Sequence, residues 1–342
     1  MRRSPAQLAL ALALLTSAAC AGSTTPPRMV PDDDEIYGVA ELTRDAKLLE
    51  AQAETPWVKQ WLAEVKNLPT IAQRTLYLSD DREQCVTEET YRSLPPEKQS
   101  KLSPRIVDET FYYNTYYGHG LAYLRAFEVL AQVGTRFKEG PPKKVLDFGY
   151  GSIGQLRQLA GLGSTAVGVD VSEVLTSMYS WPEDTGEIRG TLPGRLAVYG
   201  GQYPADLELK AKVGGEYDLV ISKNVLKRGY IHPAEKADPK RLVHLGVDDA
   251  TFLATIREAL VPGGHFLIYN ICPKPAPPGE PYIPWADGHS PWTQEEWERA
   301  GFKVLAFDVV DDEKMRAMGR VLKWEGVDTG YFAHYTLVMR PE

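Results

Sequence analysis

The chain has 342 residues, of which 43% are hydrophobic and 25% are charged, and its formal net charge is −8. These values are typical of a soluble globular protein with one or two domains. The acidic balance and the absence of any run of Lys or Arg argue against a protein that coats nucleic acid, because phosphate binding needs clustered basic side chains.

The first twenty residues have the three parts of a secretory signal. Arg2 and Arg3 form a charged start, residues 8–15 are apolar but too few to span a bilayer, and small residues then lead to Cys20. The Ala-Ala-Cys ending resembles a bacterial lipoprotein processing box. We therefore expect export, with a lipid anchor at Cys20 and a periplasmic or membrane-anchored protein.

Two alternatives to lipidation stay open. Ser17 stands where lipoprotein signals usually have Leu, so plain cleavage after Ala19 or Ala21 would also fit. An incidental apolar start would leave the protein in the cytoplasm.

The region that follows is expected to be a linker and then helices. Residues 21–38 are rich in Pro, Thr and Asp and predict a flexible tether. Residues 39–140 predict a helical cap region: the pattern over 41–68 is helical with a break at Pro56, and 116–134 predicts a longer helix.

The cysteines beyond the signal segment do not suggest a metal site. Cys85 and Cys272 could form a disulfide in an oxidising compartment, or they could be two free buried thiols. No Cys/His spacing is typical of zinc, so we expect no metal.

Residues 141–342 predict a second, α/β domain in which strands and helices alternate. Strands are expected at 144–148, 165–171, 195–201, 217–225, 265–271, 303–310 and 331–340, and helices at 153–163, 251–264 and 293–302. Such alternation favours a doubly wound, mostly parallel sheet covered on both faces. The last two strands lack a long helix between them, which predicts an antiparallel final hairpin.

A glycine-rich loop follows the first of these strands. Gly149, Gly151 and Gly154 satisfy G-x-G-x-x-G between a strand and a helix, with Tyr150 inside the loop. Gly149 permits a sharp turn, Gly151 lets a ligand approach the backbone, and Gly154 lets helix and strand pack closely. Asp170 closes the second strand 21 positions after Gly149, where a carboxylate can bond both ribose hydroxyls. The spacing predicts an adenosine-binding site.

Asp147, two positions ahead of the glycines, indicates which adenosine ligand is bound. An anion there would repel a pyrophosphate but attract a sulfonium or an α-ammonium group. The alternative is a carboxylate that caps the helix or braces the loop. Through "VLDFGYGSIG", "VGVD", "YDLVISKNVL" and "LVPGGHFLIYN" the chain resembles the class I S-adenosylmethionine-dependent methyltransferases, over roughly residues 143–340.

The resemblance implies a seven-stranded sheet with a reversed final hairpin and S-adenosylmethionine as cofactor. It implies that Asp147 and Gly149–Gly151 line the amino-acid end of the cofactor and that Asp170 holds the ribose. The chain departs from the family in two places. Many family members have an acid after the third strand that reads the adenine amine, but here the stretch is "VYGGQYPAD", so Gln202 or backbone groups would take that role. Ser222, which we place with the cofactor residues, begins a "SKN" segment that lacks the Asn/Asp-Pro-Pro-Tyr motif of amino-group methylation.

Residues behind the fourth strand are candidates for the acceptor side, because ligands bind beyond the carboxyl ends of the strands. His232 is the preferred general base, with Tyr230 beside it, although a histidine before a proline can equally hold a turn. Asn224 and Lys223 could orient a carboxylate or carbonyl, unless the lysine lies in solvent.

Two aromatic segments could close the acceptor pocket. Residues 272–292 form a long, proline-stiffened loop in which Tyr282 and Trp285 predict an ordered lid. The tyrosine cluster in 111–120 could contribute from the N-terminal side, or could simply pack helix against sheet.

The leading prediction is an exported methyltransferase that acts on a small molecule. Because the methyl donor is made in the cytoplasm, a non-catalytic module that binds an adenosine-like ligand or a partner protein is a second possibility. A nicotinamide-dependent oxidoreductase is a third, disfavoured by Asp147. The sequence identifies neither the acceptor nor the oligomeric state.

Overall fold

The computed structural model describes residue 29 and residues 37–342. The predicted signal peptide, the anchor at Cys20 and most of the predicted tether lie outside these residues. In the described part of the chain no helix is both long and apolar enough to cross a bilayer.

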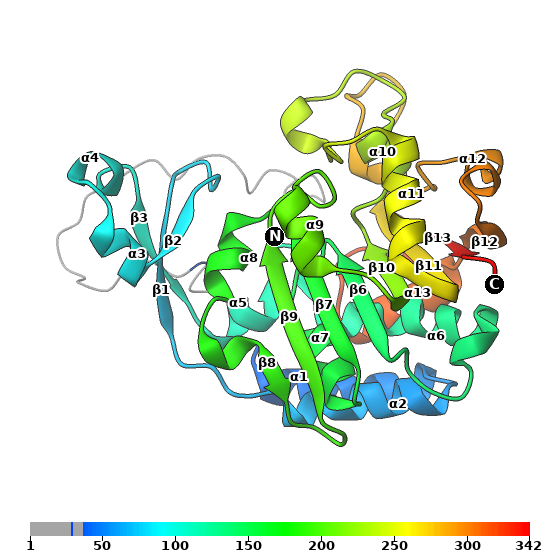
Figure 1. The fold of residues 1–342 in the computed structure, drawn as a ribbon, viewed down its shortest axis with the longest axis horizontal. Helices are drawn as coiled ribbons and strands as arrows, with labels where there is room; N and C mark the ends of the chain where they lie inside the picture. Colours follow the sequence, from blue (N-terminus) through cyan, green and yellow to red (C-terminus); the bar gives the residue numbers. More distant parts are fainter. Residues whose placement is uncertain (1–28, 30–36) are drawn as a thin grey trace, which may run out of the picture.

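The core of the molecule is an eight-stranded mixed sheet (Figure 1). Its strand order is β12-β13-β11-β10-β6-β7-β9-β8. The bounds are β6 Lys144–Phe148, β7 Thr165–Asp170, β8 Gly186–Ile188, β9 Gly194–Gly200, β10 Tyr217–Lys223, β11 Leu260–Pro273, β12 Lys303–Val310 and β13 Tyr331–Met339. Strands β6, β7, β9, β10 and β11 are parallel, whereas β13 is antiparallel to both of its neighbours and β8 is antiparallel to β9.

Helices cover both faces of this sheet, because successive strand residues alternate between two hydrophobic clusters. In β10, Leu219 and Ile221 face one cluster and Val220 faces the other. The first face is covered by α1 Val39–Leu49, α2 Pro56–Ala63, α6 Leu124–Val133, α7 Gly154–Gly161, α8 Glu173–Met178 and α13 Asp312–Val321. The second is covered by α9 Leu207–Val213, α11 Asp249–Ala259 and α12 Gln294–Arg299.

The predicted doubly wound sheet with its reversed final hairpin is confirmed, and each of the seven expected strands is present. The short strand β8 extends the sheet at one edge. The stated reason for the hairpin was wrong, because α13 lies between β12 and β13. Met315 and Met318, three residues apart and fully buried, supply the apolar face of this helix.

The N-terminal extension contains more than helices. A small antiparallel sheet of β1 Arg74–Leu78, β2 Cys85–Thr87 and β3 Ser103–Val107 stands beside the large one (Figure 1). The predicted long helix over 116–134 begins only at Leu124, since Gly118 (φ +91°) turns a short hairpin ahead of it. A Cβ on Gly120 would lie 2.6 Å from the backbone nitrogen of Gln155, so this segment packs directly on α7.

Short elements complete the chain. They are α3 Glu88–Ser93, α4 Pro96–Gln99, α5 Glu109–Tyr113, β4 Asn114–Thr115, β5 Gly118–His119, α10 Arg228–Ile231 and α14 Val327–Gly330, with 3₁₀ turns η2 Glu50–Gln52, η3 Glu64–Asn67, η4 Gly120–Tyr123, η5 Thr135–Phe137, η6 Pro182–Asp184, η7 Pro239–Arg241 and η8 Pro284–Ala286.

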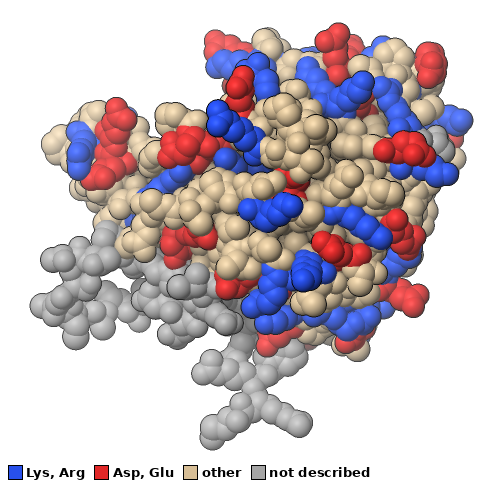
Figure 2. Space-filling model, turned by 90° about the horizontal axis from the view of Figure 1, so that it is seen from below, with Lys and Arg blue, Asp and Glu red and all other residues tan. Residues whose placement is uncertain are grey.

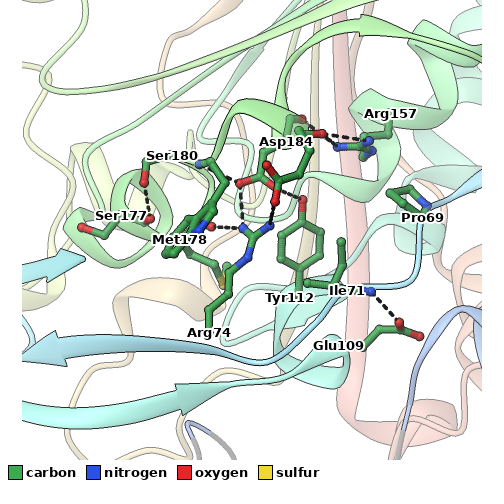
Figure 3. Close-up of polar contacts among 12 residues, drawn as sticks. Pro69, Ile71, Arg74, Glu109, Tyr112, Arg157, Ser177, Met178, Ser180 and Asp184 are labelled. Atoms are coloured by element: carbon green, nitrogen blue, oxygen red, sulfur yellow. Dashed lines mark hydrogen bonds and ion pairs between the residues drawn. The ribbon is translucent and has the colours of Figure 1, made fainter. Parts of the chain in front are cut away.

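A buried ion pair ties the small sheet to the large domain (Figure 3). The Arg74 guanidinium donates to both carboxylate oxygens of Asp184, at 2.7 and 2.9 Å, and to the Met178 carbonyl at 2.7 Å. The Tyr112 hydroxyl donates to Asp184 at 2.7 Å, and Arg157 donates to the Asp184 backbone carbonyl at 2.7 Å. All five residues are buried, and the Asp184 carboxylate compensates the charge of Arg74 within the protein.

Basic and acidic side chains are mixed on the face of the molecule drawn in Figure 2. Figure 2 shows one face on which basic and acidic side chains are interspersed between uncharged ones. That face has no broad basic surface of the kind that nucleic-acid binding needs.

Candidate functional site

The glycine loop lies at the carboxyl end of β6. Gly149 (φ +75°) and Gly151 (φ +57°) adopt left-handed backbone conformations that favour glycine. A Cβ at Gly149 would collide with the Val225 side chain, and one at Gly151 would lie 2.8 Å from Cβ of Tyr117. The sequence predicted that a ligand would approach Gly151. The structure shows that protein side chains also approach both glycines.

Gly154 has a different environment from the one predicted. A Cβ there would meet Tyr113 at 3.7 Å and Gly120 at 3.9 Å, which are ordinary van der Waals contacts. The helix therefore faces the N-terminal extension at this point, and close packing on the strand does not require the glycine.

Asp170 lies at the tip of β7, as its spacing predicts. Its carboxylate accepts the backbone N–H of Gly151 at 3.3 Å and that of Ser172 at 2.9 Å, and the residue remains partly exposed. The next residue, Val171, has 69% of its surface exposed, and Tyr117, at 56%, lies within electrostatic range of Asp170. A carboxylate, an exposed apolar side chain and an exposed aromatic ring thus lie near the glycine loop at the carboxyl end of β7, and this set fits a ribose and a flat base.

Asp147 is fully buried. Its carboxyl oxygens accept the Tyr123 hydroxyl at 3.2 Å and the Gln155 amide at 3.1 Å, and the same amide donates to the Tyr150 carbonyl at 2.8 Å. Burial raises the pKa of Asp147 to about 7. These contacts are those of the loop-bracing alternative, so its charge would act on a ligand through space.

Three further residues expected at the cofactor have side chains engaged within the protein. The Tyr150 side chain is buried against Gly168, and the Ser222 hydroxyl, also buried, donates to the Phe148 carbonyl at 3.1 Å. The exposed Gln202 donates its amide to the His244 carbonyl at 3.0 Å. A ligand would meet the backbone of Tyr150 rather than its ring.

On the acceptor side, Asn224 (φ +67°) braces the tips of β10 and β11. Its side-chain oxygen accepts the N–H of Ile271 at 2.6 Å, and its own N–H donates to the Tyr269 carbonyl at 3.1 Å. Tyr230 is half-buried and lies within electrostatic range of Tyr117; burial raises the pKa of Tyr230 to about 12.

His232 is placed differently from Tyr230. It is exposed, and its Nε2 lies 2.9 Å from a carboxylate oxygen of Asp249 at the start of α11. Among the described residues no hydrogen bond or ion pair joins His232 to the glycine loop or to Asp170. Its contacts are those of the turn-holding alternative.

Two buried lysines at the end of β10 were not predicted as buried groups. Lys227 (4% exposed) donates its ammonium to the carbonyls of Ile271 at 2.7 Å and Trp285 at 3.2 Å. Lys223 (7% exposed) is level with the glycine loop, and burial lowers its pKa to about 8. The sequence marked Lys223 only by its place at the end of an apolar strand, and Tyr117 only as a member of the tyrosine cluster in 111–120. Nothing in the pattern singled out Val171.

The long loop after β11 is ordered. The Arg241 guanidinium lies 5.4 Å from the Trp285 ring centroid, and the Ala234 N–H donates to the Tyr282 hydroxyl at 3.4 Å. The loop therefore packs on the segment around α10, and Figure 1 shows the two together at the top of the molecule. Whether it covers an acceptor stays a prediction.

Cys85 and Cys272 are free and buried, which confirms the alternative without a disulfide. Burial raises the pKa of Cys85 to about 12, so its thiol is un-ionised at neutral pH.

Comparisons with known proteins match folds rather than sequences. No protein-family model and no curated protein matches the chain. A Geobacter sulfurreducens S-adenosylmethionine-dependent methyltransferase solved with S-adenosylhomocysteine is 16% identical, over 62% of this chain and 90% of its own, with a TM-score of 0.36. The Synechocystis magnesium protoporphyrin IX methyltransferase is 14% identical, over 64% and 84%, at 0.34, and the [4+2]-cyclase SpnF is 15% identical, over 63% and 81%, at 0.36. Likeness of this degree assigns no activity.

Proposed function

We propose that the protein is an S-adenosylmethionine-dependent methyltransferase that acts on a small-molecule acceptor. The observation that carries the proposal is the placement of Asp170 at the tip of β7, bonded to Gly151 of a glycine loop and bordered by Val171 and Tyr117. The strand order supports it, because ligands in open α/β sheets bind where the order reverses, which here is between β6 and β10.

The residues divide the work of binding. Asp170 would accept hydrogen bonds from the ribose hydroxyls, while Val171 and Tyr117 would cover the base. The partial negative charge of Asp147 would favour a cationic ligand beyond the glycine loop. When bound, the cofactor supplies an electrophilic methyl group on a sulfonium.

For the transfer itself the protein would align the acceptor and exclude water, and alignment alone contributes on the order of 7–11 kcal/mol. Tyr230 is placed to contact an acceptor. His232 could remove a proton only after its pair with Asp249 opened, so the proposal does not depend on a histidine base.

Calorimetry with S-adenosylhomocysteine tests the proposal. We expect Asp170→Ala to weaken binding by roughly 100-fold or more, since two charge-assisted hydrogen bonds are lost. Asp218→Ala is the matched control: its carboxylate also accepts two bonds, from Arg136 and Lys144, but at the opposite edge of the sheet. The control should bind like the wild type.

Two other results would redirect the assignment. Preference for a nicotinamide dinucleotide would replace the proposal with an oxidoreductase. Binding of S-adenosylhomocysteine, with no methyl transferred from labelled S-adenosylmethionine to any member of a metabolite pool, would favour the non-catalytic binding module.

We also propose that the protein is exported and anchored through Cys20, on the pattern of its first twenty residues. Fractionation should place the wild type in the membrane fraction, and Cys20→Ala should release it into the soluble periplasmic fraction. Recovery of the wild type from the cytoplasm would remove this proposal without affecting the binding site.

A further inference from the structure

Lys223 lies at the carboxyl end of the central strand β10, between β6 and β11. It is the last residue of β10 and comes two residues after Ile221, which pairs with Asp147, so Lys223 is level with Gly149. On its other side it pairs in register with Tyr269 of β11. The residue therefore lies at the carboxyl edge of the sheet, between the glycine loop and the acceptor side.

The ammonium of Lys223 has no polar partner. It lies 5.1 Å from the centroid of the Tyr123 ring and makes no hydrogen bond or ion pair with any residue that the structure describes. Only 7% of the residue is exposed. A buried charge is costly unless it is paired, and Lys227 nearby illustrates the usual solution, with two backbone carbonyls on its ammonium.

Asp147, whose charge acts on Lys223 through space, is already engaged, and so is Asp311, which bonds the neighbouring Tyr269. Asp147 accepts Tyr123 and Gln155, and burial leaves it only partly ionised at neutral pH. Asp311 is paired with Arg125 at 3.0 Å and also accepts the Tyr269 hydroxyl at 2.7 Å. The remaining titratable neighbours, His119 and Lys227, do not supply negative charge, and both interact electrostatically with Lys223.

A phosphate would be a poor partner for this cation. The N–H groups of Gly149 and Gly151 are bonded to the Val169 carbonyl and to Asp170, so the loop offers few free donors. The carboxyls of Asp147 and Asp170 would also repel a dianion. A single carboxylate, planar and singly charged, matches one free ammonium.

We infer that Lys223 binds a carboxylate of a ligand at this edge of the sheet. The inference deepens the proposed function and rests on it: the carboxylate belongs either to the amino-acid end of the methyl donor or to the acceptor. Lys223 is then a residue that determines which ligands the site accepts.

Two variants in which methionine replaces a lysine, each tested with two ligands, show whether the carboxylate belongs to the methyl donor or to the acceptor. Calorimetry compares S-adenosylhomocysteine with methylthioadenosine, which lacks the amino-acid carboxylate, on the wild type, on Lys223→Met and on the burial-matched control Lys227→Met. If the donor's carboxylate is bound, Lys223→Met weakens S-adenosylhomocysteine by about 10- to 100-fold and leaves methylthioadenosine unchanged. The ratio of the two affinities stays at the wild-type value in Lys227→Met.

If Lys223→Met changes neither ligand, the acceptor is the remaining source. Acetate, succinate and benzoate are then titrated into the S-adenosylhomocysteine complex and followed by saturation-transfer NMR. Binding to the wild type and loss in Lys223→Met supports the inference, and binding to neither, or equally to both, overturns it. If the wild type binds neither adenosine compound, the proposed function fails. Titrating acetate, succinate and benzoate into the free protein then tests, independently of that function, whether Lys223 binds a carboxylate.

Discussion

Replacing Asp184 by alanine is expected to lower the free energy of unfolding by about 3–5 kcal/mol, which is the usual cost of leaving a buried charge without its partner. The Arg74 guanidinium would lose its two bonds to Asp184, and the Tyr112 hydroxyl and the Trp181 N–H would lose their acceptor. Urea denaturation of the purified protein, followed by circular dichroism, measures the change.

The neighbouring acid provides a control in the same turn. The Glu183 carboxylate lies 3.5 Å from Arg74, but its side chain is 65% exposed, so Glu183→Ala should change stability by less than about 1 kcal/mol. Combining Asp184→Leu with Arg74→Met removes both charges and should recover much of the loss. A difference below about 1 kcal/mol between Asp184→Ala and Glu183→Ala would mean that the pair contributes little to holding the small sheet.

Replacing Asp147 by asparagine should have the opposite effect on stability. Because the pKa of Asp147 is raised to about 7 in the folded protein, folding favours the protonated carboxyl, and ionisation opposes folding as pH rises. The loss of stability that this ionisation causes is absent near pH 4, grows up to about pH 7 and is constant above it. Asp147→Asn should therefore match the wild type at pH 4 and exceed it above pH 7 by at most about 4 kcal/mol.

This gain is expected to come with a loss of ligand discrimination. The variant can no longer place negative charge near the glycine loop, so its affinity for S-adenosylmethionine should fall more than its affinity for the uncharged thioether S-adenosylhomocysteine. Thermal unfolding across pH 4–9 and calorimetry with both compounds check the two halves. Stability curves for wild type and variant that stay parallel across this range would contradict a buried carboxyl with a raised pKa.

The large sheet was predictable because its strands read as short apolar runs, and the central strands β6 and β10 are buried on both faces. "KVLDF" and "KVLAFDVV" coincide with β6 and β12, and the Thr293–Glu296 capping box starts α12. The small sheet was not predictable, because Arg74 interrupts the apolar pattern of β1, and its reason for being there is Asp184, which is more than a hundred residues away.

Sequence spacing predicted the site residues that a backbone motif positions. It did not predict the residues whose environment is set by tertiary contacts. Asp170 follows from its distance to Gly149, and the structure places it at the loop. The burial of Lys223 and Asp147 depends on Tyr123 and the N-terminal extension packing over them, which no local pattern encodes. His232 looked suitable on chemistry alone, but its partner is Asp249.

The hairpin of the N-terminal extension touches the glycine loop itself: the Thr115 hydroxyl donates to the Gly151 carbonyl at 2.6 Å, and Gly120 abuts the start of α7. The boundary at residue 140, which marks the start of the alternating strands and helices, therefore separates the glycine loop from the hairpin that packs on it. A shortened gene that encodes only residues 141–342 would produce a glycine loop without the hairpin that packs on it. Any minimal version of this protein therefore has to retain the hairpin over residues 114–119 and the Gly120 turn that follows it.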